Sequence, residues 1–160
     1  MTRRLMTSAI LALALTCTLA AADKPDFTGS WKMNAAKSDF GPMPPPDKWD
    51  MAVEHKDPAL KVKTTMANQM GERTNEAAYT TDGKETTVGE GAGQTQATVT
   101  WDGESIVFKT VRKANMQGEQ IEIKGVEKWT LSGDGKTLTV DMTLTAPMGE
   151  FQMKRVMDKQ

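Results

Sequence analysis

The sequence has 160 residues, which fits a single domain. Twenty lysine and arginine residues stand against 21 acidic ones, and the formal net charge of −1 excludes a strongly basic protein that coats nucleic acid. The one cysteine, Cys17, lies in an N-terminal segment that we expect to be removed, so no disulfide is expected in the mature protein.

Residues 1–22 have the pattern of a secretory signal peptide. Arg3 and Arg4 precede an uncharged stretch from Leu5 to Leu19, and alanines occupy the three positions that follow. This stretch is too short for a membrane-spanning helix, so no stable membrane insertion is expected. The sequence predicts cleavage after Ala22, a periplasmic or secreted location, and one domain over residues 23–160.

The mature chain has the pattern of a β protein. It is rich in threonine, which is typical of strands, and poor in large aliphatic residues. Apolar and polar residues alternate in many segments, which predicts strands with one buried face. A proline-rich linker, Ala35 to Lys48, follows the first strand. The expected strands cover approximately residues 27–34, 49–55, 60–66, 72–81, 84–90, 94–101, 104–113, 119–131, 136–146 and 150–158.

Turn residues between these segments predict consecutive hairpins. The clearest are Asp82-Gly83, Asp102-Gly103 and Asp134-Gly135, because glycine accepts the positive φ of a tight turn. Consecutive hairpins build an all-β, antiparallel up-and-down β-barrel of about 8–10 strands, in which the last strand pairs with the first. A β-sandwich is the competing fold, and only the proline-rich linker is long enough for its crossover.

The first expected strand contains Gly29-x-Trp31, which resembles the first-strand motif of the calycins, the lipocalins and fatty-acid-binding proteins. The agreement extends to Phe27 and Lys32, and to a later Phe40-Gly41 pair that is similar to the intracellular fatty-acid binders. The resemblance implies that Gly29 permits a close crossing at the barrel end and that Trp31 closes this end. Fatty-acid-binding proteins carry two helices between their first two strands, whereas only the linker is available here.

The whole mature chain also resembles the small secreted lipocalin-like domain proteins of bacteria. That family has no established reaction or ligand, so the resemblance implies the calycin-like fold and leaves the function open. The similarity is carried by Asp26 to Lys32, Lys37 to Gly41, Glu54 to Pro58, and Trp129 to Ser132 followed by Asp134 to Thr139.

The sequence contains no recognisable catalytic constellation. His55 is the single histidine, which excludes a metal site built from two histidines, and no Gly-x-Ser-x-Gly motif occurs. His55 stands next to a turn, where a solvated histidine is expected. We therefore expect no metal and no cofactor, and a secreted enzyme is the least favoured function.

A binding interior is better supported. Several strands carry inward side chains that are long, flexible or aromatic, and methionine adapts to irregular ligands. The favoured function is the binding of a small apolar or fatty-acid-like molecule by a monomer, and the alternative is a filled, non-binding structural or protein-interaction barrel of the cell envelope. The candidate lining residues are Met66, Tyr79, Phe108, Trp129, Met142 and Met153.

The surroundings of Arg155 distinguish a binding barrel from a non-binding one. Arg155 alternates in phase with Met153 and Met157, so it points inward if they do, and a buried guanidinium needs a partner. Resemblance to the fatty-acid binders implies pairing with an acidic ligand head, whereas resemblance to the lipocalins implies packing across Trp31. Surface exposure is the third possibility, and Glu127 is a candidate internal partner. Arg112 is a second candidate ligand-binding arginine, although it lies near a turn.

Overall fold

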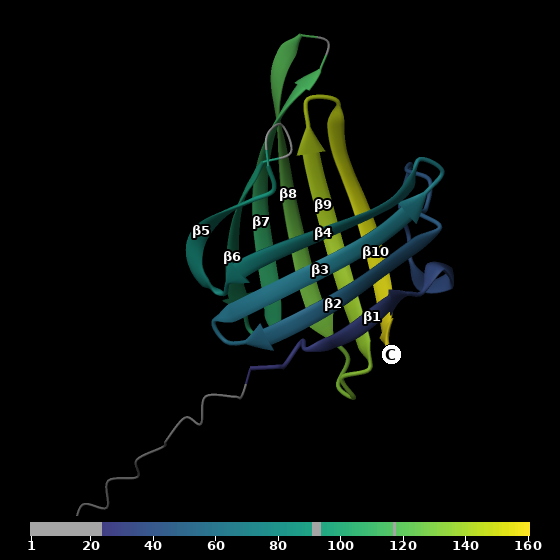
Figure 1. Ribbon diagram of the computed structural model, residues 1–160, viewed down its shortest axis with the longest axis vertical. Helices are drawn as coiled ribbons and strands as arrows, with labels where there is room; N and C mark the ends of the chain where they lie inside the picture. The colour runs from purple at the N-terminus through teal and green to yellow at the C-terminus, as the bar shows by residue number, and fades with distance from the viewer. Residues whose placement is uncertain (1–23, 91–93, 117) are drawn as a thin grey trace, which may run out of the picture.

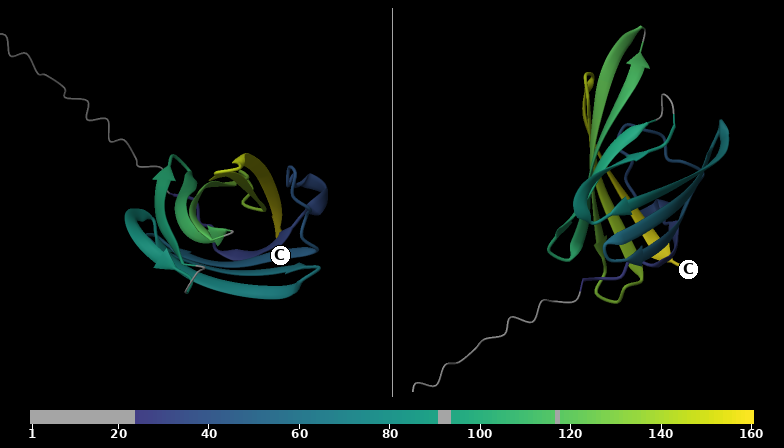
Figure 2. Two further views of the ribbon diagram at one scale, coloured as in Figure 1. Left: turned by 90° about the horizontal axis from the view of Figure 1, so that it is seen from above. Right: turned by 60° about the vertical axis from the view of Figure 1, so that its left-hand side comes forward.

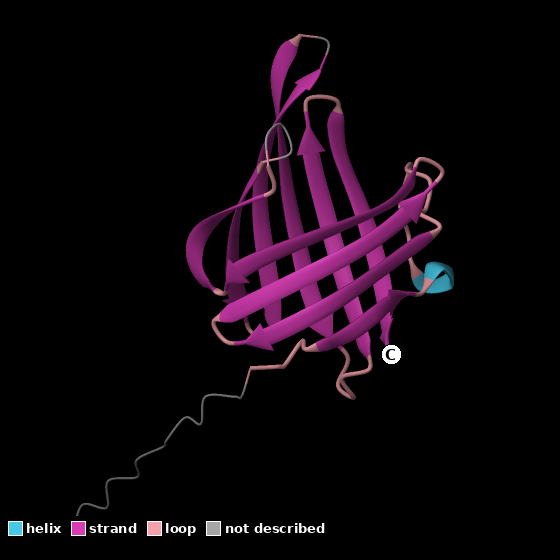
Figure 3. Ribbon diagram, viewed as in Figure 1, coloured by secondary structure: helices cyan, strands magenta, loops and turns pink. Residues whose placement is uncertain are grey.

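The computed structural model describes residues 24–90, 94–116 and 118–160 (Figure 1). The expected signal peptide and its cleavage site lie outside these ranges. The described residues form ten strands, as predicted, and the one helical segment among them is a short 3-10 helix (Figure 3). The strands are β1 (Gly29–Met33), β2 (Lys48–Lys56), β3 (Ala59–Asn68), β4 (Gly71–Thr80), β5 (Asp82–Val88), β6 (Thr95–Asp102), β7 (Ser105–Met116), β8 (Glu119–Leu131), β9 (Thr137–Ala146) and β10 (Gly149–Lys159).

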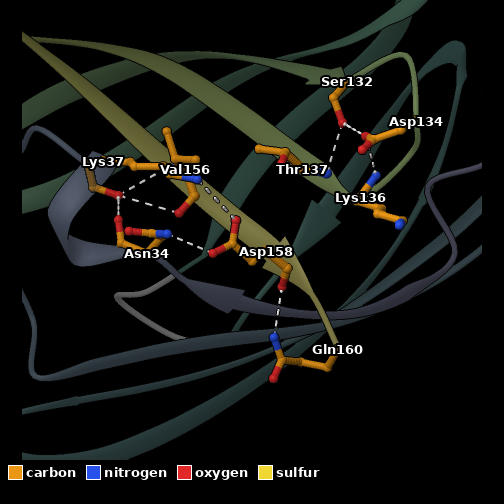
Figure 4. Close-up of polar contacts among 10 residues, drawn as sticks. Asn34, Lys37, Ser132, Asp134, Lys136, Thr137, Val156, Asp158 and Gln160 are labelled. Carbon is orange, nitrogen blue, oxygen red and sulfur yellow. Dashed lines mark hydrogen bonds and ion pairs between the residues drawn. The ribbon is translucent and has the colours of Figure 1, made fainter.

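The strands form one antiparallel sheet that curls into a nearly closed barrel (Figure 2). Its order is β4-β3-β2-β1-β10-β9-β8-β7-β6-β5, so the first and last strands pair as predicted, with Trp31 opposite Lys159. Beside this seam, the Asn34 amide donates a hydrogen bond of 2.7 Å to the Asp158 carboxylate (Figure 4). The β-sandwich alternative is therefore wrong.

The barrel is open between β4 and β5, which stand at the two ends of the sheet order. The predicted hairpin at Asp82-Gly83 is wrong, because these residues belong to β5 and mark a register shift against β6. Gly83 has a φ of +82°, and this left-handed conformation occurs at the register shift between β5 and β6, not in a tight hairpin turn. The chain turns from β4 into β5 without a ladder between them.

The other two Asp-Gly pairs do form turns. Gly103 and Gly135 both have positive φ, at +62° and +67°. In the β8–β9 turn, the Asp134 carboxylate accepts a 2.6 Å hydrogen bond from the Ser132 hydroxyl and one of 3.0 Å from the Lys136 backbone N–H (Figure 4). These bonds lower the pKa of Asp134, with the Ser132 hydroxyl as the main cause.

The linker between β1 and β2 departs from its predicted irregular structure at one point, the 3-10 helix η1 (Ala35–Lys37). Asp39 then pairs with Lys154 through two backbone hydrogen bonds of 2.7 Å, which hold the linker against β10. The proline-rich residues that follow reach β2. Across the described part of the chain, no helix is long and apolar enough to cross a membrane.

Close packing fills one end of the barrel. Trp31 is 1% exposed, and its indole N–H donates a 3.1 Å hydrogen bond to the Phe27 carbonyl. Gly29 has a φ of +152°, and the Lys159 side chain passes so close that a Cβ on Gly29 would lie 2.6 Å from its Cε. The close approach expected at Gly29 is therefore made by a side chain, whose ammonium lies 5.2 Å from the centroid of the Trp31 ring.

His55 is buried at the same end of the barrel, so the expectation of a solvated histidine is wrong. Its side chain is 4% exposed because the rings of Phe27 and Trp101 cover it, with centroids 5.8 and 5.7 Å away. Its Nδ1 accepts the Phe27 backbone N–H at 3.4 Å, which requires an unprotonated nitrogen. Burial lowers the pKa of His55, and the nearby Asp26 and Asp57 carboxylates oppose this effect only in part.

We expect acid to destabilise the protein through His55. The unfolded chain takes up a proton at this histidine near pH 6.5, whereas the folded protein takes it up only at lower pH. The free energy of unfolding should therefore fall as the pH drops below about 6.5, by at most about 1.4 kcal/mol per pH unit, and this loss should stop below the folded pKa. Urea unfolding of wild type and His55→Gln between pH 8 and pH 4.5 measures the difference.

The His55→Gln variant keeps a hydrogen-bond acceptor but cannot titrate, so its stability should change less over this range. The nearby Asp57 carboxylate should affect stability only at lower pH, since hydrogen bonds from Thr81 and Trp101 lower its pKa to about 2. Equal pH dependence of wild type and variant would contradict a role for His55.

Candidate functional site

A half-open cavity of about 770 Å³ lies between the proline-rich segment and the inner faces of the strands. Its lining includes Asn68, Gln69 and Met70 at the β3–β4 turn, so it lies at that end of the barrel, away from the packed end around Trp31. We call it the upper cavity. Its lining is formed by Phe40, Met43, Pro44, Pro45, Pro46, Asp47, Trp49, Met66, Asn68, Gln69, Met70, Arg112, Met142, Leu144, Met153 and Arg155.

A smaller chamber of about 120 Å³ lies deeper in the barrel. Trp49 and Arg155 line both spaces and so stand at the boundary between them. The other residues of this inner chamber include Tyr79, Phe108, Glu127 and Trp129. The predicted lining residues therefore divide into two groups: the methionines line the upper cavity, and the aromatic residues line the inner chamber.

The strand ladders explain why the methionines come together. Met142 on β9 is paired with Met153 on β10, and Met66 on β3 is paired with Trp49 on β2. Side chains at directly paired positions lie next to each other on the same face of a sheet. Two separate pairs of strands thus bring long, flexible side chains to one cavity.

Arg155 is 6% exposed, which excludes the surface position. Its guanidinium forms an ion pair of 3.2 Å with Glu127 and stacks on Trp49, with 4.1 Å between the guanidinium carbon and the ring centroid. The aromatic partner of Arg155 is therefore Trp49, whereas the cation over Trp31 comes from Lys159. Glu127, which the sequence offered as an internal partner of Arg155, is the residue that forms this ion pair.

Two N–H donors at the boundary between the chambers are unpaired among the described residues. The Nε atom of Arg155 and the indole nitrogen of Trp49 are both buried without a hydrogen-bond partner. Buried donors are normally paired, and an unpaired one costs stability unless water or a ligand satisfies it. This boundary therefore favours a molecule that carries an oxygen acceptor.

The inner chamber combines aromatic packing with a polar centre. Tyr79 meets Phe108 edge-on at 5.3 Å between centroids, and Phe108 lies 4.7 Å from Trp129. The Trp129 indole donates a 3.1 Å hydrogen bond to the same Glu127 oxygen that Arg155 contacts. Burial, with the Glu127 charge as a second cause, raises the pKa of Tyr79 to about 12, so its hydroxyl stays protonated.

Arg112 occupies a different position from Arg155. It is exposed near the upper end of β7 and lines the upper cavity at its rim. Among the described residues, no cluster of three or more histidine, cysteine, aspartate or glutamate side chains is arranged to hold a metal ion.

Sequence reasoning missed the part of the lining that comes from the linker. Met43 and the three prolines after it were assigned only to a connection, and Trp49 only to a strand start. The linker residues are held against β10 by the pairing of Asp39 with Lys154, which joins residues far apart in the sequence. No local pattern signals such a pairing.

Comparison with solved structures supports the fold. No family model and no curated protein matches the sequence. Among solved structures, the zebrafish ileal bile acid-binding protein complexed with cholic acid matches with a TM-score of 0.57 at 15% identity, over 84% of this chain and 98% of that chain. A mutant of the fluorescent protein UnaG matches with a TM-score of 0.57 at 17% identity, over 84% of this chain and 96% of that one.

A third match is the secretory abundant heat soluble protein 4 from Ramazzottius varieornatus, with a TM-score of 0.53 at 18% identity, over 84% of this chain and 94% of that one. Identities this low show the architecture alone. The chain shares the fold of these structures, a calycin-like barrel of ten antiparallel strands that is nearly closed.

Proposed function

We propose that this protein binds a small amphipathic molecule in the upper cavity. The observation that carries the proposal is the half-open space of about 770 Å³ on which Arg112, Met142, Met153 and Arg155 converge. This volume is typical of small-molecule sites, which are mostly apolar with a few polar groups. The bile acid-binding protein among the similar structures, solved with cholic acid, supports the same use of the fold.

The polar groups favour a ligand that carries a carboxylate or another oxygen acceptor. The free donors of Arg155 and Trp49 sit where the upper cavity meets the inner chamber, and Arg112 adds a positive charge at the rim. Arg155 itself is already neutralised by Glu127, so it contributes a hydrogen bond more than a net charge. An apolar body against the methionines, with an oxygen near this boundary, satisfies both requirements.

A non-binding barrel with a filled interior is the alternative function. Such a protein needs close packing throughout, as is found around Trp31. The upper cavity instead remains open and is lined mainly by apolar side chains, which favours binding.

A cavity-filling substitution tests this proposal. Leu144→Trp places a larger ring in the cavity wall, and it should weaken binding of a fluorescent probe, anilinonaphthalene sulfonate, by about tenfold or more, because the ring occupies space that the probe needs. Val126→Trp is the matched control, since Val126 is 42% exposed and lies outside the upper cavity. Val126→Trp should bind the probe as the wild type does. Oleic acid should displace the probe from the wild type and from Val126→Trp.

Saturable binding that Leu144→Trp leaves unchanged would contradict the cavity as the site. A wild type that neither binds the probe nor responds to oleic acid would contradict ligand binding of this kind and favour the structural barrel.

We also propose that the protein acts after export, in the periplasm or outside the cell. The charged start, apolar stretch and alanines of residues 1–22 support this location. The mature protein should begin at Asp23, and N-terminal sequencing of protein recovered from outside the cytoplasm measures this directly. Recovery with the leader still attached would contradict processing.

A further inference from the structure

Methionines are concentrated around the upper cavity. Five of them line it, from the linker, from β3 and its following turn, and from β9 and β10: Met43, Met66, Met70, Met142 and Met153. Met70 is 78% exposed and Met43 is 40% exposed, while the other three are half-buried. Solvent-borne reagents therefore reach sulfur atoms on the surface that the proposed ligand must cover.

We propose that the upper cavity is a methionine-oxidation site through which a peroxide lowers ligand affinity. This inference rests on the proposed binding function. A thioether sulfur attacks one oxygen of hydrogen peroxide, the O–O bond breaks, and the second oxygen leaves as water after proton transfer. The methionine loses two electrons and becomes the sulfoxide, and the peroxide is reduced.

The physical consequence follows from the change in polarity. A thioether is an apolar, flexible contact, whereas a sulfoxide carries a polar oxygen that prefers water. A ligand that covers this oxygen with its apolar body must strip it of water without supplying a hydrogen bond. Each oxidised residue in the contact surface should therefore weaken binding, by about tenfold when it is fully covered.

Other methionines of the protein provide internal controls. Met51 borders the inner chamber and Met157 lies in the packed end; they are only 4% and 0% exposed, so both should resist mild peroxide treatment. Met148 is 69% exposed but is not part of the cavity lining, so it should oxidise without an effect on binding.

The experiment measures anilinonaphthalene sulfonate affinity before and after mild peroxide treatment of the wild-type protein. Peptide mass mapping identifies the oxidised residues, and urea unfolding checks that the fold is retained. A variant with leucine at all five cavity methionines keeps the lining apolar at similar volume. Met148→Leu is the matched single variant outside the cavity.

We expect peroxide to weaken probe binding by about tenfold or more in wild type and in Met148→Leu. The five-leucine variant should bind equally well before and after treatment, and methionine sulfoxide reductases should restore the wild type. Unchanged wild-type affinity despite sulfoxides in the cavity would overturn the inference, as would an equal loss in the five-leucine variant. Failure of the untreated wild type to bind any probe would instead overturn the proposed function.

Discussion

Replacement of Trp31 by alanine should lower the free energy of unfolding by about 3–5 kcal/mol, the range measured for large buried aromatic residues. Its side chain is 1% exposed, and its indole N–H is bonded to the Phe27 carbonyl. The substitution removes both the packed ring and the donor that satisfies this carbonyl. Urea unfolding monitored by circular dichroism measures the loss.

Trp49→Ala is the matched comparison within the same barrel. Trp49 is half-buried, its indole nitrogen has no partner among the described residues, and one side of its ring faces the upper cavity. Its loss should therefore cost clearly less than the loss of Trp31. Small and equal losses in both variants would contradict the role of Trp31 as the closing residue of the packed end.

Replacement of Arg155 by glutamine should destabilise the protein by about 3 kcal/mol, the lower end of the range for breaking a buried ion pair. The substitution leaves the Glu127 carboxylate, which is 23% exposed, without its positive partner. It also removes the cation that stacks on Trp49. An arginine that met only a ligand could be replaced with little loss of stability, whereas the ion pair with Glu127 makes Arg155 part of the folded structure.

A double-mutant cycle separates the ion pair from a ligand contact. Glu127→Gln combined with Arg155→Gln removes both charges, so the double variant should recover much of the stability that the single variant loses. Recovery of stability without recovery of oleic acid binding would indicate that Arg155 also contacts the ligand. Independent, additive losses in the cycle would contradict coupling between the two residues.

Lys159→Gln tests the cation at the packed end. Its ammonium lies over the Trp31 ring, so this variant should change the fluorescence of Trp31, whereas Arg155→Gln should chiefly affect Trp49.

Local patterns determined the strands of this protein and the faces they bury. Alternation grouped Met153 and Met157 on one face of β10, and Met142 was a candidate inward residue on β9; all three are half-buried or buried. The period of a strand is two residues, so a short segment is enough to assign its faces. The pairs Asp102-Gly103 and Asp134-Gly135 likewise indicated hairpins, because the turn depends on the local chemistry of these residues.

Only the tertiary structure decided which partners the inward side chains meet. Alternation placed Arg155 on the same face of its strand as Met153 and Met157, but its neighbours Glu127 and Trp49 come from strands that the sheet order brings near it. The same holds for His55, which is buried because Phe27 and Trp101 fold over it. The opening between β4 and β5 and the upper cavity also depend on how the whole sheet closes. Such contacts join residues far apart in the chain, and their energies depend on three-dimensional packing that no local pattern contains.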